Sequence, residues 1–260
     1  MQAIARFLKP SRFKLVFIVE WLAFSVFFGL QVGNPTLRQF ANLLWPLALY
    51  YLCGCIFVNA CKNGHQALAH VRFLSLIAVA LAGVDHGVKA WAYTQIPLGD
   101  SVSILQNHLH LSHAQNTAGS WVLATLDSGP GFKLLLIVVI PVVLLLSPLA
   151  YRFYVHNHQR SYWPAIAYIG FVAGMLSWVV DISLRGAVID YIAMPGIVTA
   201  DFKDILLSFG IAAFFVEAME NPAISARWKG WRVEYSELRD LILSFVQFVG
   251  RETFGENRTR

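Results

Sequence analysis

Two aspartates, Asp190 and Asp204, have the residue type and the placement to do chemistry in this chain. They lie near the ends of two successive hydrophobic segments, where an ionisable side chain is costly and therefore indicates a functional site by default. Two carboxylates that share a site split their titrations, so that one stays protonated near neutral pH while the other ionises. One can then act as general base and the other as general acid. The pair suggests an aspartyl protease that requires no metal and no cofactor.

The composition predicts that this chain is embedded in a membrane. Hydrophobic residues make up 57% of it and charged residues only 13%, which leaves too little polar surface for an ordinary soluble domain. A helix of roughly 20 mostly apolar residues crosses a bilayer. The expected fold class is an all-α polytopic membrane protein with about six transmembrane helices, near residues 14–30, 43–60, 73–93, 132–154, 163–180 and 205–218.

The distribution of charge predicts the orientation of these segments. With the N-terminus inside, the inner segments hold all of the basic residues except Arg38, Lys89, Lys133, Arg185 and Lys203. Such a bias is typical of cytoplasmic loops, so both termini should be cytoplasmic. Every aspartate except Asp240 falls in the outer halves of spans or in outer loops, which predicts an active site at the outer face. The net charge of +5 suits anionic lipid headgroups and requires no nucleic acid.

Polar residues between the third and fourth spans suggest a small outer domain. Asp85 and Lys89 are spaced i,i+4, close enough to pair on a helix. The segment 98–129 alternates around His108 to Leu111 like a strand, and turn residues follow from Asn116. His108, His110 and His113 could hold zinc, because His-x-His places two imidazoles on one strand face. Strand histidines at a wet interface need no metal, however, and we predict none.

These motifs, taken in order, resemble the prolipoprotein signal peptidase family, signal peptidase II, over about residues 73–220. The matching residues are Asp85, Lys89, Leu98, Gly99, Asp100, Asn116, Thr117, Asp181, Asp190 in the run Gly186 to Tyr191, and Asp204. The resemblance implies a β-cradle at about residues 98–129 and a catalytic dyad of Asp190 and Asp204. It further implies supporting or substrate-binding roles for Asp85, Lys89, Asn116, Asp181, Arg185 and Asp201. The implied substrate is a bacterial prolipoprotein cut before a lipid-modified cysteine, at the outer face of the cytoplasmic (inner) membrane.

The chain departs from the family pattern at four positions close to these motifs. They are Trp178, Ile182, Asp201 and Lys203, so the chain is a divergent member. Lys203 would favour the ionised form of Asp204 if it points into the site, and it could also pair with Asp201. The departures favour an alternative function, that of a catalytically inactive relative acting as a lipoprotein-binding or accessory membrane protein. Both dyad aspartates are present, and this favours the enzyme.

Three regions are expected along the chain. Residues 1–72 form a two-helix membrane extension, residues 73–222 form the four-helix core with its cradle, and residues 223–260 form a basic amphipathic cytoplasmic tail. The apolar stripe of the tail suits a helix lying on the membrane surface, which we prefer, or a helix that binds a protein partner. A membrane-protein partner could also use the N-terminal spans. The stripe consists of Leu238, Leu241, Ile242, Phe245, Val246 and Val249.

Overall fold

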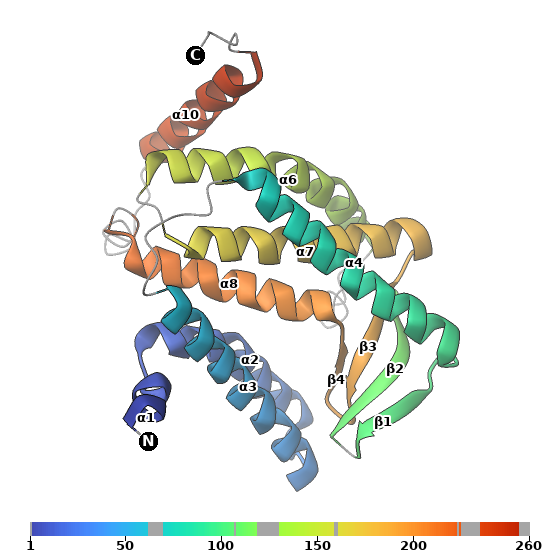
Figure 1. Cartoon of the computed structure of the whole chain (residues 1–260). Coiled ribbons are helices and arrows are strands. Elements are labelled where there is room, and N and C mark those ends of the chain that lie inside the picture. The colour runs from blue at the N-terminus through green and yellow to red at the C-terminus, as the bar shows by residue number, and fades with distance from the viewer. Residues whose placement is uncertain are drawn as a thin grey trace.

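Helices dominate the computed structural model, and a small sheet lies at one end of the helical bundle (Figure 1). The structure describes residues 2–61, 70–106, 108–118, 130–158, 161–222, 224 and 235–254. The helices are α1 (Gln2–Leu8), α2 (Arg12–Val32), α3 (Leu37–Cys61), α4 (Val71–Gln95), α6 (Pro130–Asn157), α7 (Trp163–Arg185), α8 (Phe202–Glu220) and α10 (Tyr235–Phe254). The strands are β1 (Ser101–Leu105), β2 (Leu109–Asn116), β3 (Val188–Met194) and β4 (Val198–Ala200).

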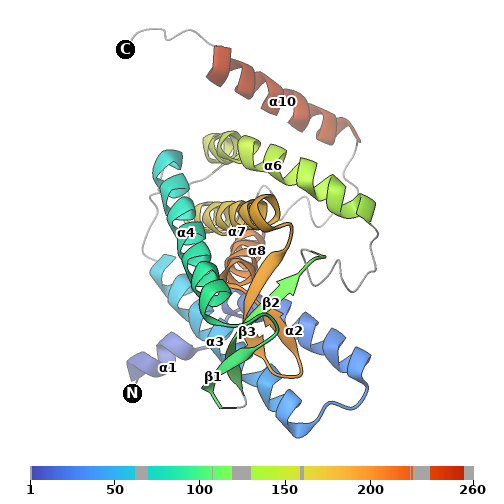
Figure 2. The ribbon, with the colours of Figure 1, turned by 90° about the vertical axis from the view of Figure 1, so that its right-hand side faces the viewer.

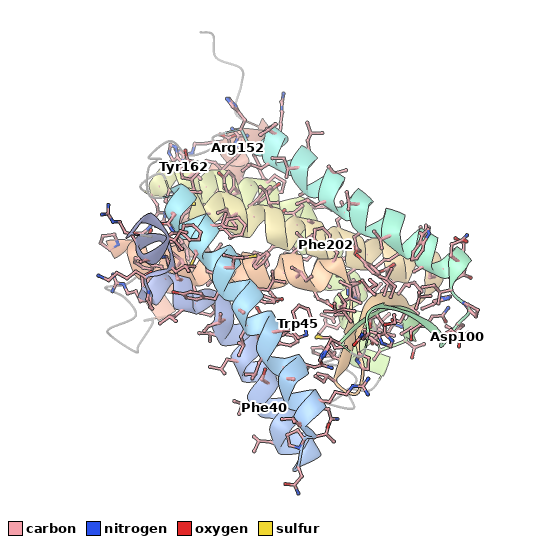
Figure 3. The ribbon with its side chains drawn as sticks, turned by 60° about the horizontal axis from the view of Figure 1, so that its bottom comes forward. Phe40, Trp45, Asp100, Arg152, Tyr162 and Phe202 are labelled. Carbon is pink, nitrogen blue, oxygen red and sulfur yellow. The ribbon has the colours of Figure 1, made fainter. Side chains whose placement is uncertain are left out.

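Five of the described helices are long and apolar enough to cross a membrane, namely α2, α3, α4, α6 and α7. They correspond to the first five predicted spans, and the protein is a multi-pass membrane protein. The sixth predicted span is α8, a helix of 19 residues. It is not among the five, and it carries Lys203, Asp204, Glu217 and Glu220. Arg152 and Tyr162 lie toward the end of the bundle opposite to Asp100 and the sheet (Figure 3).

Helices α7 and α8 approach each other closely at a pair of glycines. A Cβ atom on Gly170 would lie 2.5 Å from the carbonyl oxygen of Leu206, and one on Gly210 would lie 3.1 Å from the amide nitrogen of Phe171. Small residues at such a crossing allow two membrane helices to pack backbone against backbone. This packing aligns the C-terminal end of α7 with the N-terminal end of α8, where the sequence places its acidic residues.

The sheet is antiparallel, with strand order β1-β2-β3-β4. The strand predicted from the alternation near His108 is β2, but β3 and β4 were not predicted. The fifth span was predicted near residues 163–180, and helix α7 continues five residues further, to Arg185. Helix α7 ends at Gly186, which adopts a left-handed conformation (φ 68°), and Asp190 lies on a strand. A short apolar run such as Val188–Met194 has no period that separates strand from helix.

The two ends of the chain pack on opposite sides of the core. Helices α2 and α3 contact α8 through aromatic rings, with Phe17 and Phe57 lying 6.1 and 5.7 Å from Phe209. Helix α10 lies against α6 (Figure 2) and places Phe245 and Phe248 on Phe153, at 5.4 and 5.5 Å. The predicted amphipathic C-terminal helix is thus present. Part of its apolar stripe is more than one-third exposed, at Leu241, Ile242 and Val246.

Candidate active site

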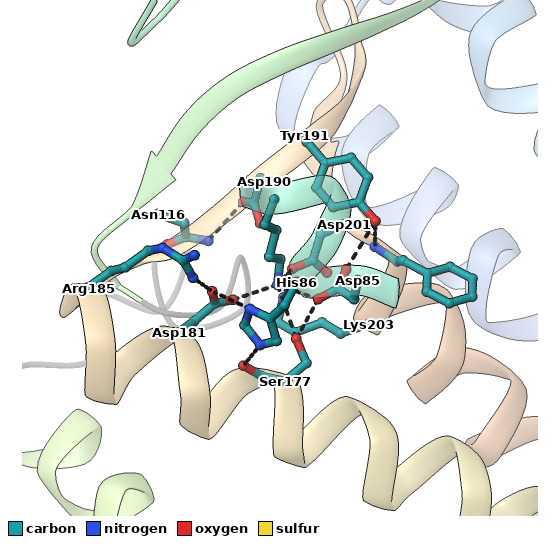
Figure 4. A network of polar contacts seen from close by, with 12 residues as sticks. Asp85, His86, Asn116, Ser177, Asp181, Arg185, Asp190, Tyr191, Asp201 and Lys203 are labelled. Atoms are coloured by element: carbon teal, nitrogen blue, oxygen red, sulfur yellow. Dashed lines mark hydrogen bonds and ion pairs between the residues drawn. The ribbon is translucent and has the colours of Figure 1, made fainter. Parts of the chain in front are cut away.

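Lys89 is the shared partner of three carboxylates in the network of polar contacts that Figure 4 draws. The Nζ atom of Lys89 lies 2.6 Å from Asp85, 2.5 Å from Asp181 and 2.6 Å from Asp201. All four side chains are fully buried, and they come from α4, α7 and the residue that precedes α8. The i,i+4 pair of Asp85 and Lys89 forms as the spacing indicated. One ammonium group therefore ties three elements together.

Hydrogen bonds satisfy the remaining oxygens of this ion cluster. Asp85 accepts one from the Ser177 hydroxyl at 2.5 Å and one from the Tyr191 hydroxyl at 3.0 Å. Asp181 accepts one from Arg185 at 2.9 Å. A buried ion pair is tolerable only when its other lone pairs are bonded in this way, because removing charges from water is expensive. The cluster therefore holds α4, α7 and the start of α8 together.

The start of α8 carries a second, smaller group of charges. Asp201 caps the helix in a reciprocal capping box with Asp204, in which each side chain accepts from the backbone amide of the other at 3.2 and 3.3 Å. The Nζ atom of Lys203 lies 2.8 Å from Asp201 and 3.1 Å from Asp204. Asp201 and Lys203 do pair, and the lysine points inward with 4% of its surface exposed.

Asp190 lies in a different environment. It is 4% exposed on β3, and the Asn116 side chain donates a hydrogen bond to it at 3.4 Å. Burial raises the pKa of Asp190 to about 7, and the negative charge of Asp204 adds to this rise, although Lys203 opposes it. The side chain of Asp204, in contrast, is 46% exposed. The two carboxyl groups thus lie in different environments, one buried and the other partly exposed.

The carboxylates of Asp190 and Asp204 lie close together. One oxygen from each of Asp190, Asp201 and Asp204 falls within 4.8 Å of the other two. Among the described residues, this is the only group of three potential metal ligands, and His108, His110 and His113 do not form another. Two oxygens 4.8 Å apart can both hydrogen-bond one water at roughly 2.8 Å. This arrangement can activate a water molecule.

A cleft of about 430 Å³ opens beside Asp190. Its walls are β2 with the turn after it, from Ala114 to Ala118, and the end of the β3–β4 hairpin, from Ile197 to Thr199. The cleft places a reaction partner next to the buried carboxyl group.

The site residues named from the sequence form two bonded groups, Asn116 with Asp190 and the ion cluster with the charges at the start of α8, and sequence reasoning missed three residues that contact the cluster. Ser177 also accepts a hydrogen bond from Lys89 at 3.2 Å, and the ring of His86 lies 3.8 Å from Asp181. Ser177 lies four residues before Asp181 on the same helix face, which was an available signal. Tyr191 gave no signal, since it neighbours Asp190 on a strand and so points to the opposite face.

The family model described as signal peptidase (SPase) II matches residues 77–220, more than half of the chain. The chain belongs to the signal peptidase II family. Its similarity to lipoprotein signal peptidases is moderate: 26% identity over 151 residues with the Streptococcus pneumoniae protein and 27% over 153 residues with that of Lactococcus lactis subsp. lactis. These matches span 57% and 58% of this chain, and 93% and 96% of the relatives.

The fold agrees with this assignment. A bacterial membrane enzyme solved by the in meso method is 20% identical and superimposes with a TM-score of 0.50, over 60% of this chain and 98% of its own length. Membership in the signal peptidase II family supports a protease in the bacterial inner membrane. Residues before 77 and after 220 lie outside the match to the family model, and so do α1 to α3 and α10.

Proposed function

We propose that this chain is an aspartyl endopeptidase that cleaves the signal peptide of lipid-modified prolipoproteins at the outer face of the membrane. The observation that carries the proposal is the proximity of Asp190 and Asp204, whose carboxylate oxygens lie within 4.8 Å beside an open cleft. The family assignment and the names of the relatives, lipoprotein signal peptidases, support the substrate.

The environments of the two carboxyl groups support distinct roles. Asp204 is half-exposed and paired with Lys203, and it takes the role of the base that removes a proton from water. Asp190 has a raised pKa of about 7, so it is the acid that donates a proton to the scissile carbonyl oxygen. Attack by the hydroxide oxygen gives a tetrahedral diol. Its collapse returns the proton to Asp190, while Asp204 delivers its own to the leaving amine.

The buried ion cluster holds both aspartates in place for this reaction. Lys89 anchors Asp201, and the capping box fixes Asp204 on the first turn of α8. On the other side, Asn116 and the sheet hold Asp190. Charges that are placed before the reaction stabilise a developing oxyanion without reorganisation. Lys89, Asp85, Asp181, Arg185 and Asp201 therefore act by positioning.

The membrane orientation follows from the charge distribution. The dyad lies at the sheet end of the bundle, which is the end poor in basic residues. We place this end outside, both termini in the cytoplasm, and α10 on the inner membrane surface. A secreted precursor tethered by its signal peptide and its diacylglyceryl group then presents its cleavage site at the level of the dyad.

The test is cleavage of a synthetic diacylglyceryl-modified precursor peptide by the purified full-length chain in lipid vesicles. We expect a single cut before the modified cysteine, identified by mass spectrometry, and no cut in the same peptide without lipid. If the chain binds the lipidated peptide but leaves it intact, it is an inactive relative that serves as a lipoprotein-binding or accessory protein. Cleavage of both peptides at equal rates would contradict the proposed specificity for lipidated substrates.

A further inference from the structure

The first turn of α3, in the N-terminal extension, is closed by a capping box of Thr36 and Gln39. The Oε1 atom of Gln39 accepts from the Thr36 amide at 2.9 Å, while the Thr36 hydroxyl accepts from the Gln39 amide at 3.3 Å. These bonds fix the side-chain amide of Gln39 so that its Nε2 points away from the helix. That nitrogen donates to the carbonyl oxygen of Gly196 at 2.9 Å.

Gly196 forms the turn of the β3–β4 hairpin. It has a positive φ of 76°, and the turn closes with a hydrogen bond from the Ile197 amide to the Met194 carbonyl at 3.0 Å. A Cβ on Gly196 would lie 3.4 Å from Nε2 of Gln39, so the glutamine packs directly on the turn. The extension therefore contacts the core sheet at a residue 157 positions away in the chain.

A second contact joins the same part of α3 to the other hairpin of the sheet. The ring Nδ1 of His108, at the β1–β2 turn, lies 2.5 Å from Oδ1 of the buried Asn42. Gln39 and Asn42 are three residues apart and so lie on one face of α3. One helix face thus contacts the turns of both hairpins, and α3 is in turn packed on α8 through Tyr50, whose ring lies 5.4 Å from Phe209.

The β3–β4 hairpin matters for the site because of what it connects. Asp190 lies on its first strand, and its second strand leads directly to Asp201 and Asp204. Its residues Ile197 to Thr199 also form one wall of the cleft beside Asp190. The position of the hairpin turn relative to the other wall, formed by β2 and the turn after it, therefore sets the width of the cleft.

We propose that the N-terminal helix pair is a built-in strut of the peptidase site, and that Gln39 is a positioning residue that holds the β3–β4 wall of the substrate cleft at a fixed distance from the opposite wall, formed by β2 and the turn after it. This role rests on the proposed function, because the cleft must receive the precursor peptide. It applies to a part of the chain that lies outside the match to the family model. The extension thereby contributes to substrate binding instead of serving only as an anchor.

The variant Gln39→Glu isolates this contact. Glutamate keeps the oxygen that accepts from Thr36, but it cannot donate to Gly196 and places a negative charge against that carbonyl. Leu37→Ala is the matched control, since Leu37 lies on the same helical turn and is 85% exposed. Gln39→Ala removes both functions of the side chain and serves as the second variant.

Two readouts are measured on full-length protein in vesicles, with a melting temperature to verify folding. Loss of one hydrogen bond of typical strength predicts a KM for the lipidated precursor about 3- to 10-fold higher, with kcat within about 2-fold. Hydrogen exchange should accelerate at residues 194–200 in Gln39→Glu and Gln39→Ala, and stay at the wild-type rate in Leu37→Ala.

Each result decides a different question. Equal exchange rates and equal KM values in Gln39→Glu, Gln39→Ala and Leu37→Ala would overturn the strut. A fall in kcat alone, with KM and exchange unchanged, would overturn it as well, because the cleft wall would not have moved. If the wild type cleaves no precursor, the proposed function fails, and hydrogen exchange at 194–200 still decides whether Gln39 holds the hairpin.

Discussion

Lys203 and Asp201 form a buried ion pair two residues apart at the start of α8, with Nζ 2.8 Å from the carboxylate. In the resemblance to the family both positions stood out as departures, and the structure joins them. Asp201 has a second partner in Lys89 at 2.6 Å, and Lys203 has a second partner in Asp204 at 3.1 Å. Each of the two buried charges is therefore paired on both sides, which makes its burial tolerable.

Removing either proposed dyad carboxyl group should abolish cleavage. Asp190→Asn and Asp204→Asn keep the shape of the side chain but can be neither base nor acid, so the rate should fall by at least ~10² to 10⁴. The initial rate of precursor cleavage measures this. Asp240→Asn, at an exposed aspartate of α10 outside the network, is the control and should retain wild-type activity. A dyad variant with more than a tenth of the wild-type rate would exclude that residue from the chemistry.

The activity should fall as the pH rises through neutrality. Burial raises the pKa of Asp190 from 3.8 to about 7, and the proposed acid must be protonated. The alkaline limb of kcat/KM should therefore have its midpoint near pH 7. Asn116→Ala removes a hydrogen bond that lowers this pKa, so the alkaline limb should move upward. A limb that stays in place in Asn116→Ala would argue that another group controls it.

The same pKa makes a prediction about stability. The folded protein holds a proton on Asp190 that the unfolded chain has already released between pH 4 and pH 7. The contribution of Asp190 to the free energy of unfolding therefore falls as the pH rises through this window. Asp190→Asn, which cannot titrate, should flatten this part of the curve of melting temperature against pH. An identical slope in the variant and the wild type would contradict the raised pKa.

Lys203→Met should shift the alkaline limb of the pH profile. The ammonium of Lys203 lowers the pKa of Asp190, so without it that pKa rises further and the alkaline limb moves up. Lys203→Arg retains the charge and should restore most of the wild-type profile. Equal profiles in Lys203→Met and the wild type would show that the lysine has no electrostatic role.

Breaking the central ion cluster should destabilise the fold itself. Lys89→Met leaves three buried carboxylates without their shared cation, and loss of one partner of a buried pair costs about 3–5 kcal/mol. Unfolding in detergent with a denaturant measures the difference. Arg152→Ala breaks the partly exposed pair with Glu252 and should cost less than about 1 kcal/mol. Similar losses in both variants would contradict the central role of Lys89.

Local patterns in the sequence were sufficient to predict the membrane helices α2, α3, α4, α6 and α7 and to name the candidate site residues. An apolar run long enough to span a bilayer is a property of consecutive residues, and so is the i,i+4 spacing of Asp85 and Lys89. The strand β2 was visible in its alternation. The motif order also led to Asp190 and Asp204, because the residues that match a family can be read without knowing how the chain folds.

Only the tertiary structure decided how these residues meet. Lys89 contacts carboxylates up to 112 positions away in the chain, since 201 − 89 = 112, and no local period encodes such a contact. Val188–Met194 forms a strand because it pairs with β2. Its short sequence alone is compatible with either a strand or a helix. The inward direction of Lys203 likewise depends on the buried acids around it. A side chain at a helix end turns toward solvent or the interior according to which partners tertiary packing supplies.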